Sequence, residues 1–217
     1  MGINYNPMIV RDGLILHLDA ANVKSYPGTG STWYDMSGNG HNGVITGSVP
    51  YSTSFGGVLN TPGTTGNYIN VTSLNLASVD NTVMVASRYA DASQNGRILS
   101  GLYNNWLLGH HSSGNRRGDY YANGWVYDPT TTGGDVWGIY TGTGNISTDT
   151  WELYDNANLL ASNSSGSQGP SGLTIGRYRL DTEYTNSYIG FVMCYNRVLS
   201  AAEIRQNFNA LRGRYGI

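Results

Sequence analysis

The 217-residue sequence has little charge, a single cysteine and no long apolar run. Lysine, arginine, aspartate and glutamate make up 12% of the chain, and the formal net charge is −2. This balance provides no basic patch for nucleic acid or for an anionic membrane surface. The lone Cys194 excludes an intramolecular disulfide, and no apolar stretch approaches the ~20 residues of a membrane-spanning helix. We therefore expect neither nucleic acid nor a membrane as a partner.

The opening residues also lack the pattern of a secretory signal. Residues 1–7 contain no basic segment followed by an apolar segment. Together with the single cysteine, this predicts a protein that is made and folded in a reducing cytoplasm.

Groups for catalysis are scarce as well. A glycosidase needs two carboxyl groups at a defined separation across the scissile bond. The chain has only three glutamates, and Glu152 and Asp155 would point to opposite faces of a strand. The four histidines lack zinc-site spacing, and no Gly-x-Ser-x-Gly, Walker or dinucleotide motif occurs. The sequence therefore predicts a protein that is not an enzyme.

Tyrosine and glycine are abundant, and their arrangement indicates strands joined by tight turns. The chain has 17 tyrosines, which favour strands, and 30 glycines, which favour turns. Leu14, Leu16 and Leu18 alternate as on a strand with one inward face. Asn123-Gly124 is a strong signal for a two-residue hairpin. About a dozen such segments at regular spacing predict an all-β protein, either a two-sheet sandwich or a barrel.

One short helix is predicted near the C-terminus. Ser200 and Glu203 have the spacing of a capping box, in which each side chain accepts a backbone amide of the other residue. Ile204, Phe208 and Leu211 then recur on one helical face. We expect this amphipathic helix to lie on the sandwich as a lid.

Two segments near the ends of the chain resemble a known family. The first contains the strand Gly13–Asn22 and the turn W-Y-D-M-S-G-N-G-H-N-G at 33–43, and the second is Tyr188–Ile204, which includes Y-N-R-V-L-S-A-A-E-I. Both resemble the laminin-G-like branch of the concanavalin A-like jelly-roll superfamily. The resemblance implies a two-sheet antiparallel jelly-roll sandwich whose first and last strands are neighbours, followed by one short helix.

The run from Leu18 to Gly40 is also similar to laminin-G-like domains in virion proteins of tailed phages. Such proteins decorate capsids or form fibres and tail appendages. On this resemblance, residues 12–217 form the jelly-roll domain, and the lack of a signal and of disulfides agrees with assembly in a bacterial cytoplasm. Residues 1–11 are polar and contain Pro7, and we expect them to form an N-terminal arm that contacts a neighbouring protein.

Five aromatic residues between positions 106 and 127 form the candidate contact surface for a glycan or a neighbouring subunit. Aromatic rings supply large contact areas with a defined geometry. The alternative is that they pack in the core or pair across strands. The five residues are Trp106, Tyr120, Tyr121, Trp125 and Tyr127.

Calcium is the one candidate cofactor. It binds to carboxylate, amide and carbonyl oxygens, and Asp35 and Asn39 lie together in a glycine-rich loop. The resemblance adds weight, because related domains carry calcium near such loops. The alternative is that Asp35 accepts backbone amides in an Asx-type turn.

Three functions are consistent with these features. The first is a non-enzymatic structural protein of a phage virion, a capsid decoration or a fibre or tail accessory protein. It would contact other virion proteins, self-associate and adhere to host-surface glycans. The second is a carbohydrate-binding, lectin-like module for host or environmental polysaccharide. The third is a glycosidase of the same fold, which the missing carboxylate pair disfavours.

Overall fold

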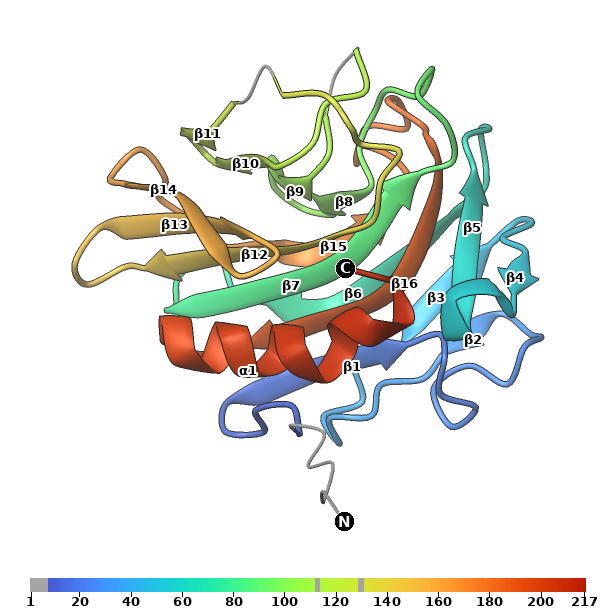
Figure 1. The fold of residues 1–217 in the computed structure, drawn as a ribbon, viewed down its shortest axis with the longest axis horizontal. Coiled ribbons are helices and arrows are strands. Elements are labelled where there is room, and N and C mark those ends of the chain that lie inside the picture. Colours follow the sequence, from blue (N-terminus) through green and yellow to red (C-terminus); the bar gives the residue numbers. More distant parts are fainter. Residues whose placement is uncertain (1–7, 112–113, 129–130) are drawn as a thin grey trace.

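The computed structural model describes residues 8–111, 114–128 and 131–217. In these residues, two antiparallel sheets pack face to face and a helix covers the outer face of one of them (Figure 1). The predicted all-β, two-sheet sandwich with a short C-terminal helix is confirmed.

Each sheet has eight strands in the described part of the chain. Sheet A has the order β14 (Asn158–Asn163), β13 (Thr150–Asp155), β12 (Gly138–Asn145), β7 (Asn81–Tyr89), β16 (Asn186–Tyr195), β5 (Val58–Pro62) and β4 (Tyr51–Ser52), and β1 (Leu14–Asp19) also pairs with β16. Sheet B has the order β11 (Trp125–Tyr127), β10 (Asp119–Ala122), β9 (Trp106–Gly109), β8 (Leu99–Gly101), β15 (Ser171–Ile175), β6 (Tyr68–Asn75), β3 (Gly43–Thr46) and β2 (Thr32–Trp33). The helices are α1 (Ala201–Leu211) and the short η1 (Ser54–Gly56) and η2 (Arg212–Arg214).

The first and last strands are neighbours, as the sequence predicts. β1 and β16 pair antiparallel, with Leu16 opposite Cys194 and Leu18 opposite Val192. These four side chains are fully buried, so Cys194 is a small core residue. Pairing of the two strands therefore closes the sandwich.

Strand boundaries follow local signals where such signals exist. Asn123-Gly124 joins β10 to β11 as predicted, and Asn123 adopts the left-handed conformation with a φ of 64°. The sequence patterns do not predict β2, β4 or β5. The first two are only two residues long, and β5 ends in Pro62, so none shows a full period of alternation.

The middle of sheet A, at β7 and β16, is buried on both faces, because sheet B covers one face and α1 the other. Along β7, Val83 and Val85 belong to the core between the sheets, whereas Met84 and Ala86 belong to the core beneath the helix. The middle of β7, from Val83 to Ala86, is therefore apolar on both sides, as strands covered on both faces are. Figure 1 shows α1, in red, lying across β7 and β16.

The predicted capping box is present at the start of α1. Glu203 donates its backbone amide to the Ser200 hydroxyl, and the Glu203 carboxylate accepts the Ser200 amide at 2.8 Å.

Within the described residues, no helix is long and apolar enough to cross a bilayer.

The helix also fixes the end of the predicted N-terminal arm. Asn207 accepts the backbone amide of Val10 at 2.7 Å, and Gln206 donates to the carbonyl of Met8 at 2.6 Å. Residues 8–11 thus run along the helix, and residues 1–7 lie outside the described residues. The boundary between arm and domain stays a prediction.

We expect Ser200→Ala to lower the free energy of unfolding by about 1 kcal/mol, because the third helical amide loses its acceptor. Urea denaturation measures the change. Ser200→Asp is the matched control, since aspartate also caps helices, and it should retain most of the stability. Equal loss in both variants would show that the cap does not stabilise the helix.

Candidate functional site

The five candidate aromatic residues do not share one surface. Trp106 and Tyr120 are completely buried and pack edge to face in the core between the sheets, with ring centroids 5.9 Å apart. Their assignment to a contact surface is therefore wrong. Both lie at positions of β9 and β10 that point toward sheet A, where no ligand reaches them.

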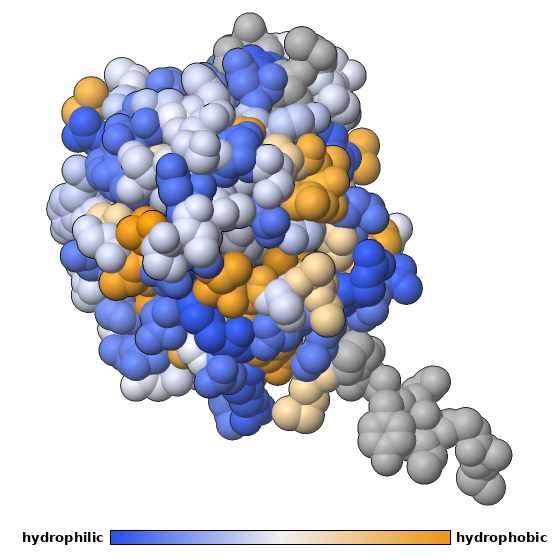
Figure 2. Space-filling model, turned by 90° about the vertical axis from the view of Figure 1, so that its left-hand side faces the viewer, coloured by the Kyte–Doolittle hydropathy of each residue, from blue (hydrophilic) through white to orange (hydrophobic). Residues whose placement is uncertain are grey.

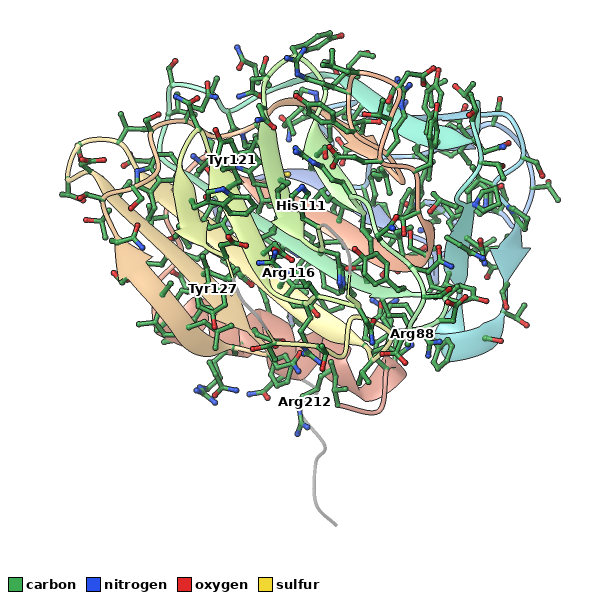
Figure 3. The ribbon with its side chains drawn as sticks, turned by 90° about the horizontal axis from the view of Figure 1, so that it is seen from above. Arg88, His111, Arg116, Tyr121, Tyr127 and Arg212 are labelled. Atoms are coloured by element: carbon green, nitrogen blue, oxygen red, sulfur yellow. The ribbon has the colours of Figure 1, made fainter. Side chains whose placement is uncertain are left out.

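Of the other three aromatic residues, Tyr121 and Trp125 lie outside the core between the sheets, whereas Tyr127 is half-buried and packs against that core. Trp125 and Tyr127 flank Val126, which is buried, and Trp125 is 38% exposed. Tyr121 is half-buried beside them, with its ring 5.1 Å from that of Trp125. Figure 3 views the molecule from the side of β8–β11 and shows Tyr121 and Tyr127 on this face. This part of the predicted surface stays a prediction for ligand contact.

His111 extends the aromatic group toward a charged loop. Its ring lies 5.5 Å from that of Trp125, and Figure 3 shows it between Tyr121 and Arg116. The His111 Nε2 atom is 3.5 Å from a carboxylate oxygen of Glu183. Glu183 comes from the loop between β15 and β16. Two segments far apart in the sequence thus meet at one site.

Glu183 is held in place by Arg97. The Arg97 Nε atom donates to Glu183 at 2.7 Å, and its guanidinium also donates to Asn105 and lies 4.1 Å above the ring of Tyr178. Arg97 is only 6% exposed, whereas the Glu183 side chain is 34% exposed. Arg97 therefore supports the carboxylate from beneath, and the carboxylate faces solvent. We call Tyr121, Trp125, His111, Glu183 and Arg97 the Trp125 cluster.

The backbone of this loop is strained at the carboxylate. Glu183 has a φ of 51°, a left-handed conformation that side chains other than glycine rarely adopt. Its carbonyl accepts the Arg97 amide at 3.0 Å, which fixes the conformation. Such strain persists where the surroundings determine it, and it is common at binding sites.

A buried acid lies beneath His111. Asp119 is completely buried, and its carboxylate accepts the backbone amide of His111 at 3.1 Å. Burial raises the pKa of Asp119 to about 7, and Arg116, 3.7 Å away, offsets only part of this effect. Burial also lowers the pKa of His111, with a further contribution from Arg97. At neutral pH the His111 ring is therefore neutral and has one donor and one acceptor nitrogen.

Sequence reasoning missed three members of this site. His111, Glu183 and Arg97 belong to no motif, and Arg97 and Glu183 are 86 positions apart. One signal was present: the segment 177–184 has four charged residues among eight, in a chain with 12% charge overall. Such a local excess of charged residues is typical of a loop whose side chains form ion pairs or contact a ligand.

Asp35 stabilises the backbone of its own turn. The Asp35 carboxylate accepts the backbone amides of His17, Ser37 and His41 and the Ser37 hydroxyl. Although burial acts to raise it, these hydrogen bonds hold the pKa of Asp35 below its usual value. The Asx-type turn is confirmed, and both carboxylate oxygens are occupied, so Asp35 has little capacity to bind calcium.

Asn39 belongs to the same turn as Asp35, and its side-chain NH₂ group donates to the Ser37 hydroxyl. Within residues 8–111, 114–128 and 131–217, no three His, Cys, Asp or Glu side chains are placed to hold a metal ion.

Known proteins resemble this chain in fold but not in sequence. No model of a protein family and no curated protein matches it. Among solved structures, the binding domain of Paraclostridial Mosquitocidal Protein 1 has a TM-score of 0.67 at 15% identity, covering 92% of this chain and 52% of that one. The ligand binding domain of botulinum neurotoxin serotype D, in complex with N-acetylneuraminic acid, has a TM-score of 0.66 at 16% identity, covering 92% and 51%.

A third structure is the binding domain of botulinum neurotoxin DC in complex with SialylT, with a TM-score of 0.66 at 18% identity, covering 93% of this chain and 52% of that one. The chain thus spans about half the length of these structures. The fold is a two-sheet β-sandwich similar to that of these binding domains.

We expect Asp119 to make stability fall as the pH rises. Its pKa is higher in the folded protein than the ordinary value of 3.8, so its contribution to folding is full below that value and is lost as the pH passes about 7. Asp119→Asn does not titrate, so its stability relative to the native chain should improve by about 3 kcal/mol from pH 5 to pH 8. Urea unfolding at both pH values measures this difference.

Asp12→Asn is the control for that measurement, because the Asp12 side chain is 87% exposed. A difference between native chain and Asp119→Asn that does not vary with pH would show that the buried carboxyl is not the titrating group.

Proposed function

We propose that this protein is a non-enzymatic, lectin-like domain that binds glycans through the Trp125 cluster. One observation carries the proposal: an exposed tryptophan ring packs beside Tyr121 and His111, next to a solvent-facing carboxylate that is fixed from beneath. A sugar ring presents a face of C–H groups and a rim of hydroxyl groups. The cluster supplies an aromatic face for the first and polar acceptors for the second.

The polar half of the cluster suits hydroxyl recognition. A carboxylate accepts strong, charge-assisted hydrogen bonds, and the neutral His111 ring both donates and accepts. Because Arg97, Asn105 and Tyr178 already fix the side of the cluster around Glu183, little side-chain entropy is lost when a ligand binds.

The similar folds support a glycan as the ligand. The serotype D domain binds N-acetylneuraminic acid, the DC domain binds SialylT, and botulinum neurotoxin type C depends on interaction with two ganglioside molecules to enter cells. At 15–18% identity these relatives share the architecture, so the residues that bind in this chain are argued from its own geometry.

The carboxylates of the chain argue against hydrolysis. Glu203 caps α1 and also binds Arg197, and Glu152 binds Tyr154 and Ser162. Glu183 therefore has no second glutamate beside it to form the acid and base pair of a glycosidase. Asp119, the acid beneath His111, is completely buried.

A glycan array followed by calorimetry tests this function. We expect the native chain to bind a defined glycan, and Trp125→Ala to weaken binding by about tenfold or more through loss of stacking. Glu183→Gln should weaken it by a similar factor, because the charged acceptor is lost. Tyr34→Ala is the matched control: Tyr34 is 48% exposed and follows β2 at the opposite edge of sheet B. Full affinity in Trp125→Ala would place the glycan elsewhere.

A second candidate, compatible with the first, is a structural role in a tailed-phage particle, with the protein located in the virion and in contact with copies of itself and other virion proteins. The similarity of Leu18–Gly40 to virion proteins supports it. So does β14, an edge strand of sheet A that exposes Leu159 by 53% and Leu160 by 41% and has neither charge nor proline. Edge strands usually have such protection against pairing.

Figure 2 shows the side of the molecule with the turn between β12 and β13 and the end of β14, where apolar groups lie among polar ones. We expect light scattering to show self-association of the native chain and a monomer for the double variant Leu159→Lys, Leu160→Lys. Val79→Lys is the control at a residue exposed by 45% between β6 and β7. A native chain that stays monomeric at every concentration would contradict this role.

A further inference from the structure

A cavity lies beside β1, away from the Trp125 cluster. It has a volume of about 350 Å³ and lies between β1, the segment 9–11 and the turn that follows β2. Pockets that bind small molecules span about 300–1,000 Å³, so this cavity accommodates one compact ligand. β1 belongs to sheet A, whereas the Trp125 cluster lies on the outer face of sheet B.

The cavity has an unpaired positive charge. Arg11 lines it and forms no ion pair or side-chain hydrogen bond with any described residue. Asp19 pairs with Arg214 at 2.6 Å, and Asp12, the neighbour of Arg11 in the chain, pairs with Arg197 at 3.0 Å. Asp35 accepts amide and hydroxyl groups of its own turn and forms no ion pair with Arg11. The Arg11 guanidinium is therefore free to pair with an anionic ligand.

Three further polar residues line the cavity, His17, Asn22 and Ser37, and the Ser37 hydroxyl already donates to the Ile15 carbonyl. The His17 Nε2 atom is buried and has no hydrogen-bond partner among the described residues, and a buried polar atom is costly unless it finds one. The Asn22 side-chain oxygen accepts the Lys24 amide, which leaves its NH₂ group to donate to a ligand.

The remaining wall is apolar. Ile9, Leu14 and Met36 line the cavity beside these polar groups. A ligand that fits has a charged end for Arg11 and an apolar part for these three side chains.

We propose that this cavity binds a compact amphipathic carboxylate, which pairs with the Arg11 guanidinium and packs its apolar part on Leu14 and Met36. Arg recognises carboxylates by two parallel hydrogen bonds, so a carboxylate fits it better than a monoatomic anion. Two sources share this chemistry: an acidic sugar residue of a glycan and a free organic acid. The site is independent of the Trp125 cluster and does not require the proposed glycan function.

Amide chemical shifts of the native chain test the site during titration with three probes. Glucuronate has a carboxylate on a sugar ring, glucose is its neutral counterpart, and hexanoate has the carboxylate without a sugar. We expect the amides of His17 and Met36 to shift with at least one carboxylate and not with glucose. Arg11→Gln should weaken that binding by about tenfold.

Arg205→Gln is the matched control, since Arg205 lies near Ala157 at the opposite end of sheet A and should leave binding unchanged. Response to glucuronate identifies an acidic sugar as the source, and response to hexanoate alone identifies an organic acid. The proposal is overturned if neither carboxylate shifts these amides, or if Arg11→Gln binds as the native chain does. Shifts around Trp125 alone would also overturn it, while they would support the proposed glycan function.

Discussion

The architecture depends on the burial of β16 in the middle of sheet A. Its central residues pair with β7 on one side and with β1 on the other, and its first residues pair with β5. From Ile189 to Tyr195 almost every side chain is inaccessible to water, so this one strand contributes to the core on both faces of the sheet. Its partners come from the beginning and the middle of the sequence, so the sandwich cannot close until the end of the chain is in place.

Local signals in the sequence predicted local structure well. The capping box at Ser200 and the Asn123-Gly124 hairpin depend on residues a few positions apart, and both are present. The surface aromatic residues were predicted only in part. Tyr120 and Tyr121 are adjacent, yet one is buried in the core and the other faces outward. Alternating side chains indicate that a segment is a strand, but they do not tell which of its two faces packs against the other sheet.

The polar residues of the candidate site could not be predicted from the sequence, and the reason is a different one. His111 and Glu183 come from connections that follow different strands of sheet B, and only the strand order brings them together. No spacing in the sequence encodes that order. The arrangement resembles many binding sites: rigid strands supply a fixed frame, and loops supply the groups that contact the ligand. Here a buried arginine and a buried aspartate fix the positions of the two loop residues.

Burial across sheet A also affects how the protein can evolve. Every residue of β7 except Arg88 is buried, whereas β14 at the sheet edge is exposed along almost its whole length. Substitutions in β7 disturb packing on two sides at once, and those in β14 disturb little. Over many generations, sequence drift should therefore leave the centre of the sheet nearly constant while the edge diversifies, so that related chains could acquire different neighbours without loss of the fold.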